Sequence, residues 1–443
     1  MTAAAAIGRF RTTVSALSAP DRIAGRLARG AAWTLGGTIT GQAATLLVSM
    51  ATARWLGSNE FGQLGVVQTT VGLFGTLAGM GLGLTTTKYV AQFRSTDAER
   101  AGRIIALSRM LAAASAVIAS LVLVFAAGTI ASSTLRSPEL ASPIRVSAGL
   151  LFLNTLFGAQ TGVLSGFEAF RSVAVAGIIR AAAALPLSMV LVPAWRVTGG
   201  IVALILATLA GCILNSRDIG RLCRRYGIQP ALTGAFAESR ILWAFSIPAL
   251  LSGSIVAPAN WLVNVLLARE PRGYAEVAVL TIASQWRMAL SFLPAVMGQP
   301  LVTVLASTKQ GGKSHRRTIL ASVAVAFISA SLLAGALVPS RGLIMRSYGD
   351  HYADRTAPLV LTILTAVLLA AEIPIGNALA AYGQMWTGAS INLIWAAVLI
   401  LSSMLFLDRG LGAEGIVLAY LIAYAVHAIS SCIALFRLFS RNQ

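Results

Sequence analysis

Long apolar stretches separated by short polar connections run through the chain from residue 31 to residue 436. A helix needs roughly 20 apolar residues to cross a bilayer, and by that measure the pattern predicts about twelve membrane spans. They cover residues 31–53, 62–85, 104–128, 145–165, 172–193, 198–215, 241–266, 276–298, 318–338, 357–380, 386–406 and 412–436. The sequence therefore predicts an all-α integral membrane protein.

The composition supports this prediction. Of the 443 residues, 57% are hydrophobic and 11% are charged, whereas soluble domains carry roughly 25% charged residues. A net charge of +19 would suggest nucleic-acid binding in a soluble protein, but the apolar background makes basic cytoplasmic loops and an anionic substrate the better explanation. The three cysteines form no CxxC motif, and no disulfide, metal site or cofactor is predicted.

The basic residues predict the orientation and the layout. With both termini on one side of the membrane, that side holds 21 Lys and Arg residues and the other side holds 9. The positive-inside rule then places both termini in the cytoplasm. The predicted regions are a basic tail (1–30), a six-helix lobe (31–215), a basic linker (216–240), a second six-helix lobe (241–436) and a short tail (437–443).

An internal repeat relates the two predicted lobes. The segment "GSNEFGQLGVV" (57–67) aligns with "EPRGYAEVAVL" (270–280) at an offset of 213, and "GIVALILA" (200–207) aligns with "GIVLAYLIA" (415–423) at 215. The offset spans six helices, and an even number preserves direction, which indicates parallel repeats with a site between them near the midplane. The alternative is a duplicated structural scaffold.

Three segments resemble a known family. Residues 28–94, from "ARGAAWTLGG" to "TTTKYVAQFR", resemble the start of bacterial polysaccharide-export flippases. "ASQWRMALSFLP" (283–294) resembles the family's eighth span, and "YGDHYADRTAPLVLTILTAVLLA" (348–370) resembles its ninth loop and tenth span. The chain thus resembles the O-antigen and exopolysaccharide translocases of the multidrug/oligosaccharidyl-lipid/polysaccharide (MOP) exporter superfamily over essentially its whole length.

This resemblance implies a V-shaped pair of six-helix bundles in the bacterial inner membrane, with alternating access and a cationic central lumen. The implied substrate is undecaprenyl-diphosphate-linked oligosaccharide, carried from the cytoplasmic to the periplasmic leaflet. Membrane lipids, a proton or sodium ion, and polysaccharide polymerase or assembly proteins would be partners, and nucleic acid would not. The related lipid II flippases usually have fourteen spans, so a count of twelve argues against that branch.

Arg287 is the most conspicuous polar residue in a predicted span. It lies about 16 Å from either end of residues 276–298 at the helical rise of 1.5 Å per residue, too deep for its side chain to snorkel easily. Ser284 and Ser291 share its helical face. Because a guanidinium bonds two phosphate oxygens and stays charged, a lumen Arg that binds the diphosphate is one interpretation. The other is an ion pair within the bundle, for instance with Glu372.

Other polar residues are weaker candidates for substrate binding. Arg180 would line the lumen or snorkel, and Lys88 would bind phosphate at the cytoplasmic mouth or anchor the helix. Asn260 and Asn264 would bond sugar hydroxyls or neighbouring helices. The glycines of the second span are expected to permit close helix packing, and they are Gly72, Gly75, Gly79 and Gly83.

Ion coupling would need an ionisable group at membrane depth. Glu372 is the only acid well inside a predicted span, and His427 lies on a polar stripe of the last span that also holds Tyr420 and Tyr424. A proton or sodium relay through Glu372 or His427 is one hypothesis. A salt bridge between Glu372 and an arginine is expected instead on general grounds, since buried charges are usually paired.

Two other functions remain open. A drug or metabolite/cation antiporter of the same superfamily commonly has an acid in its first span, and residues 31–53 contain none. A membrane polymerase or glycosyltransferase would tend to have a long periplasmic loop or a nucleotide-sugar motif, and the sequence has neither. No catalytic residues and no P-loop are predicted, so the chain is expected to be a transporter and not an enzyme.

Overall fold

The computed structural model describes residues 23–79, 81–238, 255–307, 313–382 and 384–441, and these residues form helices and no strand. The first helices are α2 (Ile23–Gly79), α3 (Leu82–Phe93), α4 (Ala98–Thr129), α5 (Ala141–Gly166) and α6 (Phe170–Arg225). They are followed by α8 (Val256–Ala268), α9 (Gly273–Ser307), α10 (Lys313–Leu337), α11 (Arg341–Ser347), α12 (Thr356–Ala381), α13 (Met385–Leu407) and α14 (Gly412–Arg441). Short helical turns cover Ile130–Thr134, Pro138–Leu140, Ala235–Glu238 and Asp350–Tyr352.

Helices α2 and α6 are each broken once. Gly57 in α2 has φ 72°, a conformation that glycine adopts without steric cost. The break in α6 falls at Trp195 and Arg196, and Arg196 has φ 50°. The Arg196 guanidinium donates to the carbonyl of Trp55 at 2.9 Å and forms an ion pair with Glu60 at 2.8 Å. The two breaks therefore meet, and contacts with α2 hold Arg196 in its strained conformation.

The helices have the length and composition of membrane spans. In the described ranges, seven helices are long and apolar enough to cross a membrane, or eight if the bent pair Ala32–Gly79 and Leu82–Phe93 counts as one span. The predicted spans 172–193 and 198–215 both lie in α6, on either side of its break. The all-α membrane fold is confirmed, while the count of twelve spans and the lobe boundaries stay predictions. The predicted span 241–266 begins outside the described residues.

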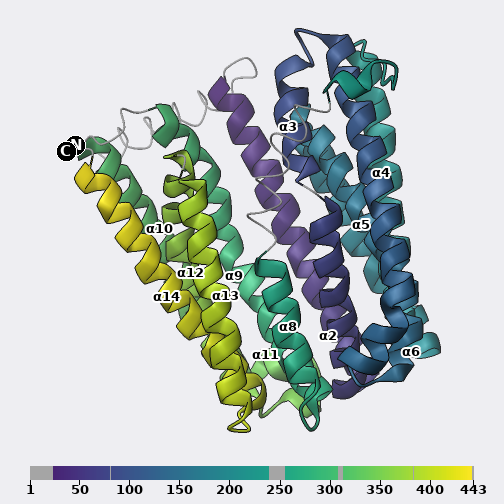
Figure 1. Ribbon diagram of the computed structural model, residues 1–443, viewed down its shortest axis with the longest axis vertical. Helices are drawn as coiled ribbons and strands as arrows, with labels where there is room; N and C mark the ends of the chain where they lie inside the picture. Colours follow the sequence, from purple (N-terminus) through teal and green to yellow (C-terminus); the bar gives the residue numbers. More distant parts are fainter. Residues whose placement is uncertain (1–22, 80, 239–254, 308–312, 383, 442–443) are drawn as a thin grey trace, which may run out of the picture.

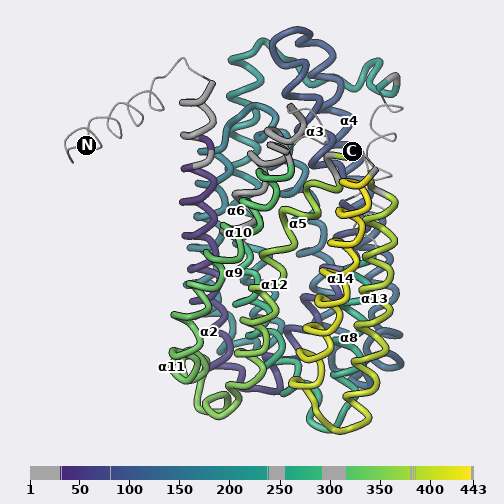
Figure 2. The backbone as a smooth tube through the Cα atoms, turned by 90° about the vertical axis from the view of Figure 1, so that its left-hand side faces the viewer, coloured from purple at the N-terminus to yellow at the C-terminus, as the bar shows by residue number. Residues whose placement is uncertain are grey.

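The two halves of the chain lie side by side (Figure 1), with α2 to α6 on one side and α8 to α14 on the other. Helix α2 packs directly against α8 and α9. The tube view shows most helices running along the long axis, with α14 ending at the same end of the molecule as the start of α2 (Figure 2). A buried apolar core continues from one half into the other, and it includes Leu64, Val67, Val263, Val277 and Leu280.

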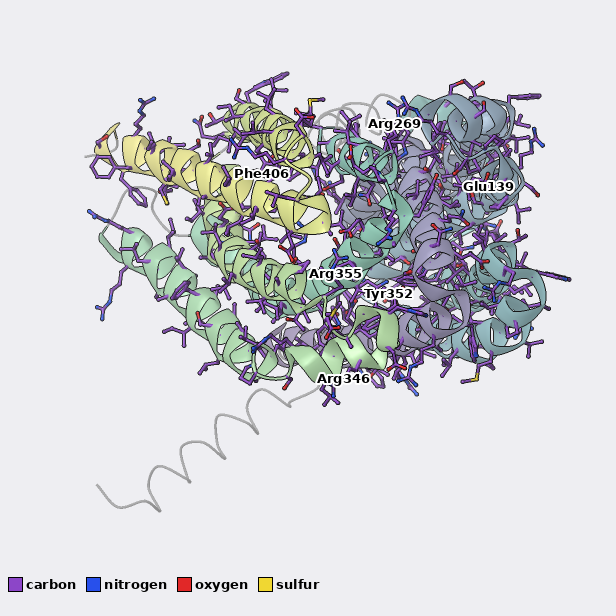
Figure 3. All side chains as sticks on the ribbon, turned by 90° about the horizontal axis from the view of Figure 1, so that it is seen from below. Glu139, Arg269, Arg346, Tyr352, Arg355 and Phe406 are labelled. Carbon is purple, nitrogen blue, oxygen red and sulfur yellow. The ribbon has the colours of Figure 1, made fainter. Side chains whose placement is uncertain are left out.

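At the opposite end, side chains tie the halves together. Arg269, at the end of α8, donates to the carbonyl of Thr134 at 2.7 Å. Arg54 of α2 donates to the carbonyl of Ser347 at 2.8 Å. Seen from below, Arg269 lies at the boundary between the halves (Figure 3). Each donor reaches a backbone carbonyl, so the contacts depend on main-chain positions and hold the halves in one relative placement.

Within the second half, Glu276 anchors the same end of the bundle. Its carboxylate accepts from Arg355 at 2.5 Å and from the backbone N–H of Ala413 at 2.8 Å. The bond from Glu276 raises the pKa of Arg355, which lies just before α12. Glu276 thus joins the starts of α9, α12 and α14.

Candidate functional site

Arg287 lies in α9 with its guanidinium over two aromatic rings of α14. Its Cζ atom is 4.7 Å from the centre of the Tyr420 ring and 5.9 Å from that of Tyr424. Distances below about 6 Å give a favourable cation–π interaction, because the ring face carries partial negative charge. Among the residues that the structure describes, Arg287 forms no ion pair. Both rings are uncharged, so they hold the cation without neutralising its charge.

A network behind the rings keeps them in place. The Tyr420 hydroxyl donates to the side-chain oxygen of Asn260 in α8 at 2.5 Å. The Trp395 ring of α13 packs at a tilt against Tyr424, with centroids 5.4 Å apart, and is 2% exposed. The site of Arg287 is therefore built from α8, α9, α13 and α14, four helices that close packing brings together.

Glu372 and His427 form a second polar pair in the same half. The Oε2 atom of buried Glu372 in α12 lies 3.1 Å from Nδ1 of His427, and the contact is an ion pair when the imidazole is protonated. The other ring nitrogen of His427 lies 3.2 Å from the side-chain oxygen of Asn392. The expected salt bridge between Glu372 and an arginine is wrong for the described residues, because α14 places His427 beside the carboxylate while Arg287 lies on the tyrosines.

A cavity of about 850 Å³ occupies the first half of the molecule, within the roughly 300–1,000 Å³ typical of small-molecule sites. Among the described residues, Arg180 is the only charged one in its lining, and its guanidinium lies 4.8 Å from the centre of the Phe157 ring. Met288 of α9, the residue after Arg287, also lines the cavity. The cavity thus reaches the helix that carries Arg287.

The glycines of α2 have a different role from the one predicted. A Cβ atom added at Gly72 or Gly79 would meet no heavy atom within 4 Å, and both residues line the cavity. Gly83 does pack closely, since a Cβ atom there would lie 3.3 Å from the carbonyl oxygen of Gly158. The expectation of close packing is therefore wrong for Gly72 and Gly79, which face open space.

The remaining predicted site residues are dispersed. Lys88 is an exposed residue of α3, with its ammonium 5.1 Å from the centre of the Tyr89 ring, and it does not line the cavity. The side-chain amides of Asn260 and Asn264 donate to carbonyls of their own helix at 2.9 and 2.8 Å. Ser284 and Ser291 are partly exposed on α9.

Sequence reasoning missed the supporting role of the aromatic residues. The stripe formed by Tyr420, Tyr424 and His427 is visible as a helical repeat in the last span, but nothing in the sequence connects it with Arg287, more than 130 residues earlier. The burial of Trp395 shows only in the packed structure.

The fold defines a class: a polytopic α-helical membrane protein. The fold matches an inward-facing multidrug resistance MATE family transporter of the MOP superfamily with a TM-score of 0.73 at 16% identity, over 92% of this chain and 98% of that one. It also matches a MOP superfamily transporter from Pyrococcus furiosus with a TM-score of 0.71 at 15% identity, over 92% and 95% of the two chains.

The sequence places the chain within that class. Residues 27–309 match the polysaccharide biosynthesis protein family, so the chain belongs to that family. It is also 25% identical over 420 residues to the EPS I polysaccharide export inner membrane protein EpsE of Ralstonia nicotianae, which covers 91% of each chain. The resemblance noted from the sequence is thereby confirmed at the level of family and fold.

Proposed function

We propose that the protein flips undecaprenyl-diphosphate-linked oligosaccharide from the cytoplasmic to the periplasmic leaflet of the bacterial inner membrane, by alternating access of its two halves. The observation that carries this proposal is Arg287, a cation of α9 in the predicted span 276–298, which lies on Tyr420 and Tyr424 and has no carboxylate partner among the described residues. Moving a diphosphate through hydrocarbon is prohibitive unless the charge is paired, and Arg287 supplies such a partner.

The aromatic support suits a site that must bind and release an anion. A cation–π interaction contributes about 0.5–2 kcal/mol, whereas a buried carboxylate would neutralise the guanidinium and repel phosphate. Tyr420 and Tyr424 therefore stabilise Arg287 without competing with phosphate for its guanidinium. In this proposal the diphosphate adds charge-assisted, bidentate bonds to a cation that is already in position.

The other site residues take secondary roles in the proposal. Arg180 is a second cation for the head group, in the cavity of the first half, and Lys88 attracts the diphosphate at the cytoplasmic mouth. The hydroxyls of Ser284 and Ser291 would donate to or accept from sugar hydroxyls, and the side-chain oxygens of Asn260 and Asn264 would accept from them. Asn260 acts chiefly through Tyr420, whose ring it orients.

Glu372 and His427 are the proposed coupling pair. The carboxylate is buried, and in the described part of the chain the imidazole lies 3.1 Å from it. Such a pair can take up a proton and exist as a neutral acid beside a neutral or charged imidazole, which changes the local charge by one. A proton is therefore the proposed coupling ion, with sodium as the alternative outcome.

The cavity lining favours this substrate over the cationic ligands of a drug or metabolite antiporter. Of the described residues in that lining, Arg180 is charged and none is a carboxylate, which suits an anionic or neutral ligand. No comparable observation supports an enzymatic role. The export protein EpsE is a relative of this chain.

The test replaces Arg287 with Ala, and separately with Lys, in cells that lack the transporter. Arg287→Ala should abolish surface polysaccharide while the protein still reaches the membrane, and Arg287→Lys should restore export only in part, because an ammonium lacks the bidentate fork. Arg145→Ala is the matched control, since Arg145 is an exposed arginine of α5. Full export by Arg287→Ala would overturn the proposal.

A further inference from the structure

Small residues create the cavity in the first half of the molecule. Six glycines and five alanines belong to its wall, and they are Gly72, Gly75, Gly79, Gly81, Gly83, Gly158, Ala112, Ala159, Ala181, Ala184 and Ala207. At Gly72 and Gly158 a Cβ atom would meet no heavy atom within 4 Å. These two positions come from different helices, α2 and α5, so the empty volume depends on missing side chains on both sides of the cavity.

The polar groups in the wall are mostly neutral. Gln68 and Asn154 line the cavity, and within the described ranges their amides form no hydrogen bond with the protein. Thr76 and Thr155 donate to carbonyls of their own helices at 2.9 and 3.0 Å, which leaves their oxygens able to accept. The wall thus offers amide donors and acceptors, hydroxyl acceptors and one cation, Arg180.

This chemistry fits a pyranose ring. Equatorial hydroxyls of a sugar pair with planar amides such as those of Gln68 and Asn154, and the flat C–H faces of the ring need close apolar surfaces, which bare glycine backbone provides. A lipid chain would leave the amides unpaired at a cost of about 1–3 kcal/mol each. A cationic ligand would meet Arg180.

We infer that this cavity holds the hexose next to the diphosphate, and that Gly72 and Gly158 determine how large a sugar the protein accepts. The inference rests on the proposed function, because it takes the diphosphate to be bound at Arg287. The next residue, Met288, is part of the cavity wall. The helix that carries Arg287 therefore also borders the cavity.

Two substitutions test the volume directly. Phe at position 72 or 158 would project its ring into the space of the sugar, whereas Gly72→Ala adds one methyl group that contacts nothing. Gly177→Phe is the matched control: Gly177 is also helical, also has nothing within 4 Å of a Cβ atom, and does not line the cavity. All four variants exchange glycine for a better helix former, so helix stability does not separate them.

The experiment measures Kd values of the full-length protein in nanodiscs for two lipids, undecaprenyl diphosphate and undecaprenyl-diphosphate-linked hexose. Gly72→Phe and Gly158→Phe should bind the bare lipid with wild-type affinity and the hexose-bearing lipid at least about tenfold more weakly. Gly177→Phe should bind both lipids as the wild type does, whereas Gly72→Ala should weaken binding of the hexose-bearing lipid less than Gly72→Phe does.

The outcomes separate this inference from the proposed function. If both Phe variants kept wild-type affinity for the hexose-bearing lipid, or weakened both lipids equally, the cavity would not be a sugar site and the inference would be overturned. The same holds if Gly177→Phe showed the same selective loss. If the wild-type protein bound neither lipid, the proposed function itself would fail.

Discussion

Removing the ring beneath Arg287 should weaken diphosphate binding without touching the cation. Tyr420→Leu takes away the nearer of the two rings, which lies 4.7 Å from the guanidinium, together with the hydroxyl that donates to Asn260. Tyr420→Phe removes only the hydroxyl. The pair of variants therefore separates the contribution of the ring from that of the hydroxyl.

The structure sets the size of each effect. A partly buried cation–π interaction is worth about 0.5–2 kcal/mol, so Tyr420→Leu should raise the Kd for undecaprenyl diphosphate by roughly 2- to 30-fold. The second ring, Tyr424, at 5.9 Å, keeps the loss toward the lower part of that range. Tyr420→Phe leaves the Asn260 oxygen without its donor, which costs about 1–3 kcal/mol of folding stability, and changes the Kd little.

The assay is equilibrium binding of undecaprenyl diphosphate to the purified full-length protein, with a thermal melt of each variant in parallel. Phe125→Leu is the control, because Phe125 is 81% exposed on α4 and contacts neither site. An unchanged Kd for a folded Tyr420→Leu protein would refute the argument that the tyrosines position Arg287. A loss of affinity in Tyr420→Phe as large as that in Tyr420→Leu would instead assign the effect to the hydroxyl.

Three further outcomes are expected. Glu372→Gln should remove the dependence of transport on a pH gradient while leaving the Kd for undecaprenyl diphosphate unchanged, and flux that still follows the gradient in reconstituted vesicles would exclude this carboxylate from coupling. Glu276→Gln should lower the free energy of unfolding by about 1–3 kcal/mol through its charged bond to Arg355, and an unaltered denaturation curve would contradict that role. Gly62→Ala should push the two halves apart at the end opposite the start of α2, because the new Cβ atom would lie 1.7 Å from the carbonyl oxygen of Tyr274. Spin-label distances between α2 and α9 would detect this separation, and an unchanged distance would contradict the prediction.

The helices were predictable because a membrane span is a local property. An apolar run of about 20 residues satisfies its own backbone hydrogen bonds and needs no distant partner, so the all-helical fold follows from the chain alone. The breaks in α2 and α6 also fall between predicted spans. The family is recognisable for the same reason, since its motifs are continuous segments of sequence.

The partners of each polar residue depended on how the helices rotate and tilt against one another, which no single segment encodes. Arg287 lies on Tyr420 and not beside Glu372, because α14 turns its tyrosines toward α9 and its histidine toward α12. Likewise, glycines in a membrane span predict close packing, but a Cβ atom at Gly72 would meet no heavy atom within 4 Å, and Gly72 lines a cavity. The sequence by itself determined a polytopic exporter with a cation at membrane depth. Only the tertiary structure decided what supports that cation and where a sugar would fit, since those contacts join residues up to hundreds of positions apart.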